Sequence, residues 1–333
     1  MTPLSLLDLA PIRQGGDAAA AYRATTELAQ AAETSGYRRF WLAEHHNMTG
    51  IGSSATAVLI GHVAEHTRSI RVGSGGVMLP NHAPLVVAEQ FGTLESLHPG
   101  RIDLGLGRAP GSGQRTVRAL RRGSVEGAER FAEDLAELRG YLGEAGREKM
   151  VQAVPGAGLD IPVWVLGSST ASAGLAASLG LPYAFAAHFA PAELFPALAR
   201  YRDEFQPSGA LAEPYAMVAM NAVVAETDAE ARYHFTSVEQ QFLGMARGRT
   251  PGPMPPPVED MDTLWEPDER DRIRAWLWAS VVGGPESARQ QYADFLQKTA
   301  ADEIMVTSQT FDPAVTVDSV RRLAAIRDEV GAA

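Results

Sequence analysis

The chain contains no cysteine among its 333 residues. This absence excludes disulfide bonds, metal sites built on thiolates and a cysteine nucleophile. Disulfides are common in proteins of oxidising compartments, so the composition favours a cytoplasmic protein.

Positive charge and long apolar runs are also scarce. Lysine is limited to Lys149 and Lys298, and 29 basic residues face 40 acidic ones, giving a formal net charge of -11. Nucleic acids and anionic membranes are bound by basic patches, so neither is expected as a partner. No apolar run is long enough to cross a membrane, and no basic region precedes the first one, so no signal peptide is predicted.

Short apolar runs instead alternate with helical patterns along most of the chain, which is typical of α/β proteins. Eight strands are predicted, at Leu4–Leu9, Arg38–Ala43, Ile70–Gly76, Ile102–Gly107, Pro162–Leu166, Pro182–Ala187, Ala216–Ala225 and Glu303–Ser308. A helix is predicted after each, over Ala18–Thr34, Ser54–Glu65, Pro84–Leu97, Glu126–Leu142, Ser169–Leu179, Pro191–Phe205, Asp228–Ala246 and Pro313–Val330. Eight strands favour a closed (β/α)8 TIM barrel, with an open doubly wound domain plus a helical domain as the alternative.

Two segments interrupt this alternation. Residues 249–267 contain six prolines and are predicted to form an inserted loop at the carboxyl face of the barrel, mobile until a ligand binds. A surface excursion without a role is the alternative. The Gly- and Arg-rich stretch Ala109–Gly123 is predicted to be a second loop. We expect one domain over residues 1–333.

The segment Ile70–Arg108 carries glycines at the carboxyl ends of two predicted parallel strands, in Gly73-Ser74-Gly75-Gly76 and Gly105-Leu106-Gly107. α/β proteins place their ligands at these strand ends. We therefore interpret the glycines as sites where a flat or bulky ligand approaches the backbone closely.

Three titratable residues, Glu44, His45 and His46, follow the second predicted strand. Such residues at a strand end are suited to proton transfer or to polar contacts with a ligand. No metal is expected, because adjacent histidines on an extended chain point apart and the HExxH motif is absent. His62 and His66 are spaced for chelation on a helix, but no third ligand is evident.

The other candidate site residues suit an anion. Arg108, after the fourth strand, offers a planar guanidinium that matches a phosphate. Ser168, Ser169 and Ser172 surround the start of a predicted helix, where hydroxyls and free amides also bind anions. Each residue has an ordinary structural alternative, a carboxylate pair for the arginine and helix capping for the serines. A dinucleotide-binding turn is disfavoured by the GxGxxxG spacing, and a serine hydrolase by the missing GxSxG motif.

In combination, these motifs resemble the luciferase-like flavin monooxygenases, the group that includes bacterial luciferase. The resemblance is carried by FWLAEHHN (40–47), RVGSGGVMLPNHAPLVVAEQFGTLESLHPGRIDLGLGR (71–108) and WVLGSSTASAGLAASLGLPYAFAAHF (164–189). Within the family, the chain is most similar to single-chain oxidoreductases, some of which resemble polyketide-tailoring enzymes. Gly107 stands where luciferase has a reactive cysteine, so light emission is not implied.

The resemblance implies a (β/α)8 barrel that uses FMN, reduced to FMNH2 by a separate flavin reductase. With O2 as co-substrate, a C4a-peroxyflavin would oxygenate a mid-sized, largely apolar organic substrate, such as a secondary metabolite. Two alternatives remain open: hydride transfer with the deazaflavin F420 on the same fold, and flavin binding without catalysis.

The resemblance also assigns roles to residues. A non-proline cis peptide is expected between Gly75 and Gly76, beneath the flavin ring, and Arg108, Ser168, Ser169 and Ser172 would contact its phosphate. His45 matches the family's active-site histidine and would transfer a proton, while Glu44 would either orient it or face the helices. A homodimer is expected through the helices Ser54–Glu65 and Pro84–Leu97. The spacing of Leu85, Ala88, Phe91 and Leu94 suits either such an interface or packing on the barrel.

Overall fold

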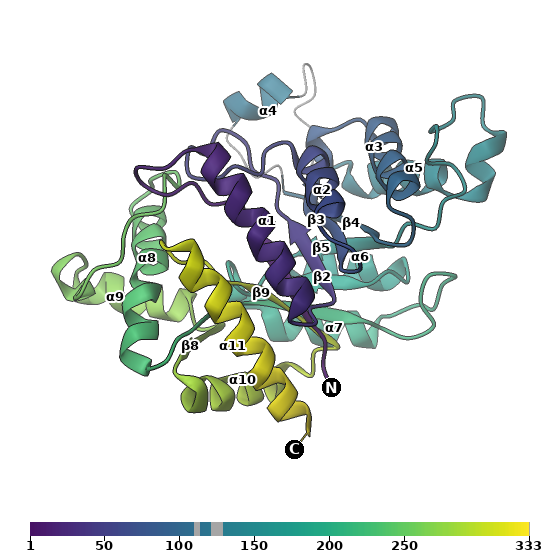
Figure 1. The fold of residues 1–333 in the computed structure, drawn as a ribbon. Coiled ribbons are helices and arrows are strands. Elements are labelled where there is room, and N and C mark those ends of the chain that lie inside the picture. Colours follow the sequence, from purple (N-terminus) through teal and green to yellow (C-terminus); the bar gives the residue numbers. More distant parts are fainter. Residues whose placement is uncertain (110–113, 121–128, 333) are drawn as a thin grey trace.

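The computed structural model describes residues 1–109, 114–120 and 129–332, which form a barrel of parallel strands surrounded by helices (Figure 1). The strands of the described residues are β1 (Leu4–Asp8), β2 (Arg39–Leu42), β3 (Arg71–Met78), β4 (Ile102–Gly107), β5 (Val163–Gly167), β6 (Tyr183–Phe185), β7 (Ala216–Val224), β8 (Ser280–Gly283) and β9 (Glu303–Thr307). Their helices are α1 (Ala18–Thr34), α2 (Thr56–Glu65), α3 (Pro84–Leu97), α4 (Gln114–Leu120), α5 (Phe131–Leu142), α6 (Thr170–Ser178), α7 (Leu194–Asp203), α8 (Asp228–Ala246), α9 (Pro267–Trp276), α10 (Pro285–Thr299) and α11 (Pro313–Ala332).

Eight of the strands close into the barrel. They pair in the order β1 to β7, after which β9 pairs with both β7 and β1. Every pairing is parallel, so all carboxyl ends lie at one face, with α1 and α11 side by side on the outside (Figure 1). The predicted (β/α)8 barrel is confirmed, and the open doubly wound alternative is wrong because the sheet has no free edge within the barrel.

Three elements were not predicted from the sequence: α9, β8 and α10. The short strand β8 pairs with the carboxyl-terminal half of β7, beyond the barrel itself. The helix α9 carries a weak apolar signal because, of its ten residues, only Ile273 is buried. Part of the predicted loop Ala109–Gly123 also differs, since Gln114–Leu120 forms α4. Residues 110–113 and 121–123 of that loop, and the first residues of the helix predicted from Glu126, lie outside the described residues.

The Pro-rich segment 249–267 belongs to a larger insertion between β7 and α10. Met254 is buried and pairs through its backbone with Ile12 and Gln14, in the loop that follows β1. The insertion also has an apolar cluster of its own, built from α8, α9 and the segment between them. It therefore packs over the carboxyl end of the barrel as ordered structure, held by its own core.

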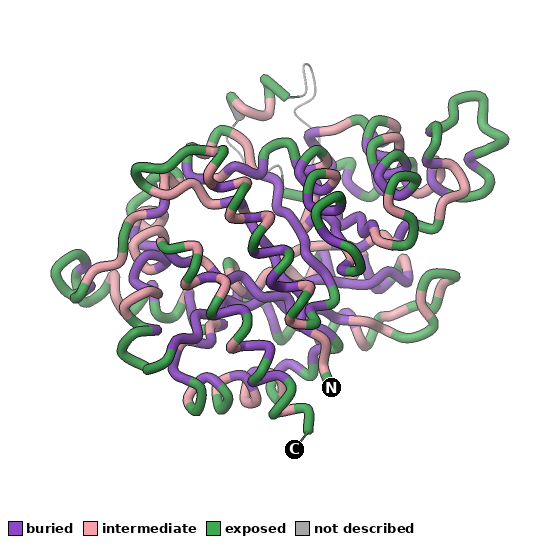
Figure 2. The backbone as a smooth tube through the Cα atoms, viewed as in Figure 1, coloured by how far each residue is buried: buried purple, intermediate pink, exposed green. Residues whose placement is uncertain are grey.

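Apolar packing separates the barrel interior from its surroundings. Inside lies a small cluster that includes Trp41, Trp164, Met217 and Met305, while a larger cluster fills the space between the strands and the helices. Figure 2 shows the result, with buried strands at the centre and exposed outer faces on the helices. Ala88, Phe91 and Leu94 belong to the larger cluster, so this stripe of α3 packs on the barrel.

The glycines of β3 and β4 are explained by contact between these two strands. A Cβ on Gly105 would lie 2.2 Å from the carbonyl oxygen of Ser74, and one on Gly76 would lie 2.7 Å from that of Gly105. The pairing register shifts between Ser74 and Val77, so Gly75 and Gly76 sit in a bulge. Protein atoms occupy the space that a side chain at Gly76 or Gly105 would need, so close contact between the strands explains these two glycines, and the approach of a ligand to this backbone stays a prediction.

Charged side chains are buried inside the amino-terminal end of the barrel. The Arg39 guanidinium on β2 contacts Asp103 on β4 at 2.7 Å and Glu303 on β9 at 3.0 Å. Arg71 adds a second ion pair to Asp103 at 2.7 Å, and the Tyr215 hydroxyl donates to Glu303 at 2.8 Å. Burial acts to lower the pKa of Arg39, but the two carboxylates outweigh it and the pKa is raised. This network, centred on Arg39, ties β2, β3, β4 and β9 together.

Among the described residues, we find no helix with both the length and the apolar character that crossing a membrane requires.

The close contact between β3 and β4 predicts that a methyl group added at Gly105 destabilises the protein. Gly105→Ala should lower the free energy of unfolding by about 3 kcal/mol, because its Cβ would overlap the Ser74 carbonyl. Urea unfolding followed by circular dichroism measures this change. Gly107→Ala is the matched control, since the nearest atom to its Cβ is 4.0 Å away. Equal stability of the two variants would show that β3 and β4 are not in such close contact.

Candidate active site

The chain leaves β2 as an extended segment, and side chains alternate along it. Glu44 and His46 therefore point to one side and His45 to the other. Asn47 then adopts a left-handed conformation with φ of 57°, which asparagine tolerates, and the chain turns away from the barrel. The three titratable residues predicted from the sequence thus divide into two groups.

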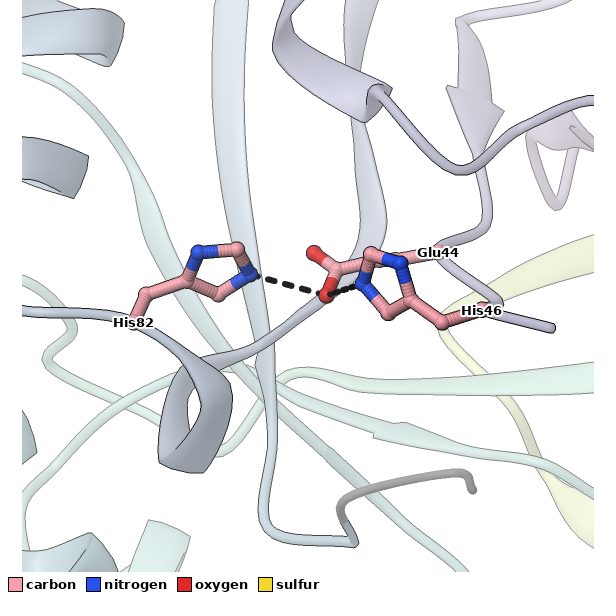
Figure 3. A group of neighbouring side chains, drawn as sticks. All are labelled: Glu44, His46 and His82. Carbon is pink, nitrogen blue, oxygen red and sulfur yellow. Dashed lines mark hydrogen bonds and ion pairs between the residues drawn. The ribbon is translucent and has the colours of Figure 1, made fainter. Parts of the chain in front are cut away.

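Glu44 binds two imidazoles with one oxygen, as Figure 3 shows. Its Oε1 accepts from Nε2 of His46 at 2.9 Å and from Nε2 of His82, which follows β3, at 2.8 Å. Burial acts to raise the pKa of Glu44, but the hydrogen bonds from His82 and His46 outweigh burial and lower it. Glu44 therefore does not hydrogen-bond to His45, and instead fixes the end of β2 against the segment after β3.

The Glu44, His46 and His82 side chains also form a donor set suited to a divalent cation. Their ligand atoms lie within 4.8 Å of one another, and two imidazoles with one carboxylate are a common set for zinc. His82 was not identified from the sequence as a candidate site residue, because it is 36 residues from His46 and only the fold brings the two together. The distances within the group are those of hydrogen bonds, so we assign it a structural role, and the expectation of no metal stays a prediction.

His45 lies at the carboxyl face with an unused ring nitrogen. Its Nδ1 is buried and has no hydrogen-bond partner among the described residues. Burial lowers the pKa of His45, and although Glu44 opposes this effect, His46 adds to it. The ring is therefore neutral near pH 7 and can accept or release a proton.

His188 is a second histidine of the same kind, which sequence reasoning missed. It follows β6, its Nδ1 is likewise buried and without a partner among the described residues, and burial lowers its pKa to about 4. A protonated His45 would lower that pKa further. His45 follows β2 and His188 follows β6, so both lie at the carboxyl face of the barrel. Asn221 on β7 holds His188 in place by donating to its carbonyl oxygen at 2.9 Å.

An aromatic wall stands beside His188. Phe189 is 48% exposed, although it neighbours Phe242 of α8 and Trp276 of α9, with ring centroids 6.5 and 6.2 Å away. The Trp276 indole donates to the Phe189 carbonyl oxygen and fixes this arrangement. The insertion after β7 thus supplies an apolar surface next to the histidines, which is suited to an apolar ligand.

The peptide bond between Gly75 and Gly76 is cis, as the family resemblance implied. It lies in the bulge of β3, one strand away from β2 and His45. The predicted position of this bond is therefore confirmed.

Arg108 and Ser168 lie at the same edge of the barrel. Arg108 follows β4 and Ser168 follows β5, and these neighbouring strands end in register, with Gly107 opposite Leu166. The Arg108 side chain is exposed and has no hydrogen-bond or ion-pair partner among the described residues. The structure therefore brings together the arginine and the first serine predicted to bind an anion.

The other two serines are engaged in capping α6. Ser169 is the N-cap residue, and it forms a capping box with Ser172. The Ser172 hydroxyl donates to the Ser169 carbonyl oxygen at 2.7 Å and also contacts the Tyr183 hydroxyl. Glu193 already accepts from the Thr170 amide at 2.8 Å. Phosphate binding by Ser169 and Ser172 stays a prediction, and it requires their hydroxyls to turn away from the cap.

Comparison with known proteins gives matches along the whole chain. A family model described as Luciferase-like monooxygenase matches residues 2–303. The Luciferase-like monooxygenase of Escherichia coli (strain K12) is 51% identical over 326 residues, which are 98% of this chain and 97% of that protein. The "Uncharacterized protein YvbT" of Bacillus subtilis is 54% identical over 328 residues, 98% and 96% of the two chains. The N-acetyl-S-alkylcysteine monooxygenase of Bacillus subtilis is 39% identical over 254 residues, 75% of each chain.

Solved structures also match along nearly the whole chain. Apo-MsnO8 superposes with a TM-score of 0.88 at 32% identity, covering 98% of this chain and 99% of its own. The oxygenating constituent of 3,6-diketocamphane monooxygenase from Pseudomonas putida, solved with FMN, has a TM-score of 0.72 at 17% identity and covers 97% and 96%. An F420-dependent secondary alcohol dehydrogenase, solved with an F420-acetone adduct, has a TM-score of 0.71 at 13% identity and covers 98% of both chains. The last two matches concern the fold alone.

The low pKa of His188 predicts a pH dependence of stability. In the unfolded chain the ring titrates near 6.5, and in the folded protein near 4, so between these values the unfolded state binds more protons. Stability should therefore fall as the pH drops from 6.5 to 4, by up to about 3 kcal/mol from this group. Urea unfolding at a series of pH values should show a shallower fall for His188→Gln. An equally steep fall in the variant would contradict the assignment.

Proposed function

The chain belongs to the luciferase-like monooxygenase family, and from this premise we propose that it is an FMNH2- and O2-dependent monooxygenase. Its substrate is a mid-sized, largely apolar organic molecule, such as a secondary metabolite. The observation that carries the proposal is the pair of buried Nδ1 atoms of His45 and His188, which have no partner among the described residues. They lie at the carboxyl face of the barrel, where His188 directly precedes Phe189 of the aromatic wall formed with Phe242 and Trp276.

The residues at this face fit a flavin mononucleotide. Arg108 provides a guanidinium without a partner among the described residues, and Ser168 lies at the same edge of the barrel, so together they would hold the phosphate. The unpartnered Nδ1 of His45 provides a polar contact for the reacting end of the cofactor. Gly75 and Gly76, in the bulge of β3, would lie under its ring.

Reduced FMN, when bound, supplies the electrons that activate O2, and this chain's residues control protons and water. His45 is neutral near pH 7 because burial lowers its pKa, so one ring nitrogen can take up a proton and later return it. His188 stays neutral for the same reason and adds no positive charge. The aromatic wall excludes water from the reacting atoms, which slows the unproductive release of hydrogen peroxide.

The proposal includes partners. FMNH2 comes from a separate flavin reductase that associates transiently, and the cytoplasmic location stays a prediction. The alternative cofactor, F420, receives support from two F420-dependent enzymes that share the fold at 13% and 14% identity. We also propose a homodimer through α2 and α3, supported by exposed apolar side chains on these helices: Val58 is 72% exposed, Val86 44% and Leu97 66%.

Anaerobic titration with photoreduced FMN tests the site. Arg108→Ala should raise the Kd for reduced FMN about tenfold, because one charge-assisted contact to the phosphate is lost. Reduced riboflavin, which lacks the phosphate, should bind equally to both proteins, and Arg23→Ala, an exposed arginine on α1, is the matched control. An unchanged Kd for reduced FMN in Arg108→Ala would contradict the phosphate assignment. Binding of reduced F420 in place of reduced FMN would contradict the choice of cofactor.

A single charged substitution on α2 tests the proposed dimer interface. Val58→Glu should convert the dimer to a monomer in analytical ultracentrifugation, because a buried, unpaired carboxylate opposes association. Leu264→Glu, which changes an exposed leucine of the insertion, should leave the dimer intact. A monomeric wild-type protein, or a dimer that is equally stable in both variants, would contradict the interface.

A further inference from the structure

A second pocket opens at the opposite, amino-terminal end of the barrel, and the proposed monooxygenase function does not use it. Its volume is about 540 Å³, within the range of small-molecule sites. The pocket is lined by Arg39 at the start of β2 and by the segments that precede β5, β6 and β7. His45 follows Arg39 by six residues along an extended chain, which places the two ends about 20 Å apart.

Most of this amino-face pocket is apolar. The apolar side chains come from the end of α5, from β5 and the segment before it, and from the segments that precede β6 and β7. They are Leu142, Leu159, Ile161, Val163, Leu181 and Leu211. Such a lining binds the apolar body of a ligand, while a few polar groups fix its orientation.

Two polar groups of the pocket have no partner among the described residues. The Trp164 side chain is almost completely buried, and its indole N–H has no acceptor. Arg139 on α5 has neither an ion pair nor a side-chain hydrogen bond. Arg139 is half-buried, so its guanidinium is open to an acceptor that a ligand supplies, and a charge-assisted contact there would be stabilising.

The other two arginines of the pocket already have partners. Arg39 is paired with Asp103 and Glu303, and Arg38 donates to the Tyr215 hydroxyl at 3.0 Å and lies 3.9 Å from Glu303. Asp160 is the acidic residue of the lining. The pocket is therefore suited to a ligand that has an apolar body and a negatively charged hydrogen-bond acceptor.

We propose that the amino-face pocket is a second ligand site, which binds a small aromatic acid. The acid group pairs with the Arg139 guanidinium, and the ring lies among the leucine side chains, next to Trp164. An aromatic carboxylate or sulfonate has this chemistry. The site is separate from the carboxyl face, so its occupation does not require a flavin.

Titration with 8-anilinonaphthalene-1-sulfonate, an aromatic sulfonate that fluoresces when bound, tests the proposal. Arg139→Ala should raise its Kd about tenfold through the loss of a charged contact. Leu211→Glu should abolish binding at this site, because it places a carboxylate in the pocket. Arg289→Ala, which removes an exposed arginine of α10, is the matched control and should leave the Kd unchanged. Equal affinities in the wild type, Arg139→Ala and Leu211→Glu would overturn the proposal.

The indole of Trp164 gives a second readout that reports on this pocket alone. The chain has five tryptophans, so a ¹⁵N-labelled sample gives one indole resonance for each, and Trp164→Phe identifies the relevant one. The probe should shift the Trp164 resonance in the wild type and in Arg289→Ala, and should not shift it in Leu211→Glu. If Trp164→Phe fails to fold, the resonance is identified as the one whose shift is lost in Leu211→Glu. A fluorescence increase without any shift of an indole resonance that depends on Leu211 would overturn the proposal.

Discussion

The ion pairs of Arg39 are the interaction on which the barrel depends. This guanidinium is buried, and it joins a strand near the start of the chain to Asp103 on β4 and to Glu303 on the last strand. Loss of one partner from a buried pair typically costs about 3–5 kcal/mol, since a charge then remains without compensation. These ion pairs can form only when β9 lies beside β1. They therefore favour the closed barrel over an open sheet, in addition to stabilising the fold. It also forms part of the floor of the amino-face pocket.

The two ends of the barrel interior differ in how their titratable groups are satisfied. At the amino end, Arg39, Asp103 and Glu303 all have partners. At the carboxyl end, the rings of His45 and His188 each keep one buried nitrogen without a partner among the described residues. Burial keeps both rings neutral near pH 7, and the insertion after β7 adds an aromatic surface beside them. A buried polar group without a partner calls for an explanation, and a bound ligand would supply one for these two histidines, which is why we propose the chemistry at this end.

The barrel, its strand ends and the cis bond between Gly75 and Gly76 could be predicted, because they depend on local apolar patterns and on motifs that are contiguous in sequence. The roles of side chains at the site could not be predicted equally well. Glu44 binds His82, which is 38 residues away, and His188 shares the carboxyl face with His45 only because β2 and β6 belong to one closed barrel. The glycines of β3 and β4 show a related limit: their sequence indicates that space is needed, but not that a neighbouring strand takes part of it. The size of the insertion was missed because α9 buries little apolar surface.

The central claim is that the carboxyl face holds a reduced flavin and protects its reaction with oxygen from water. Stopped-flow mixing of the protein, loaded anaerobically with photoreduced FMN, with oxygenated buffer tests this claim most directly. We predict a lag between the consumption of oxygen and the return of oxidised-flavin absorbance, because water is excluded from the reacting atoms. Return of that absorbance without a lag, at the rate of free reduced FMN, would contradict the account.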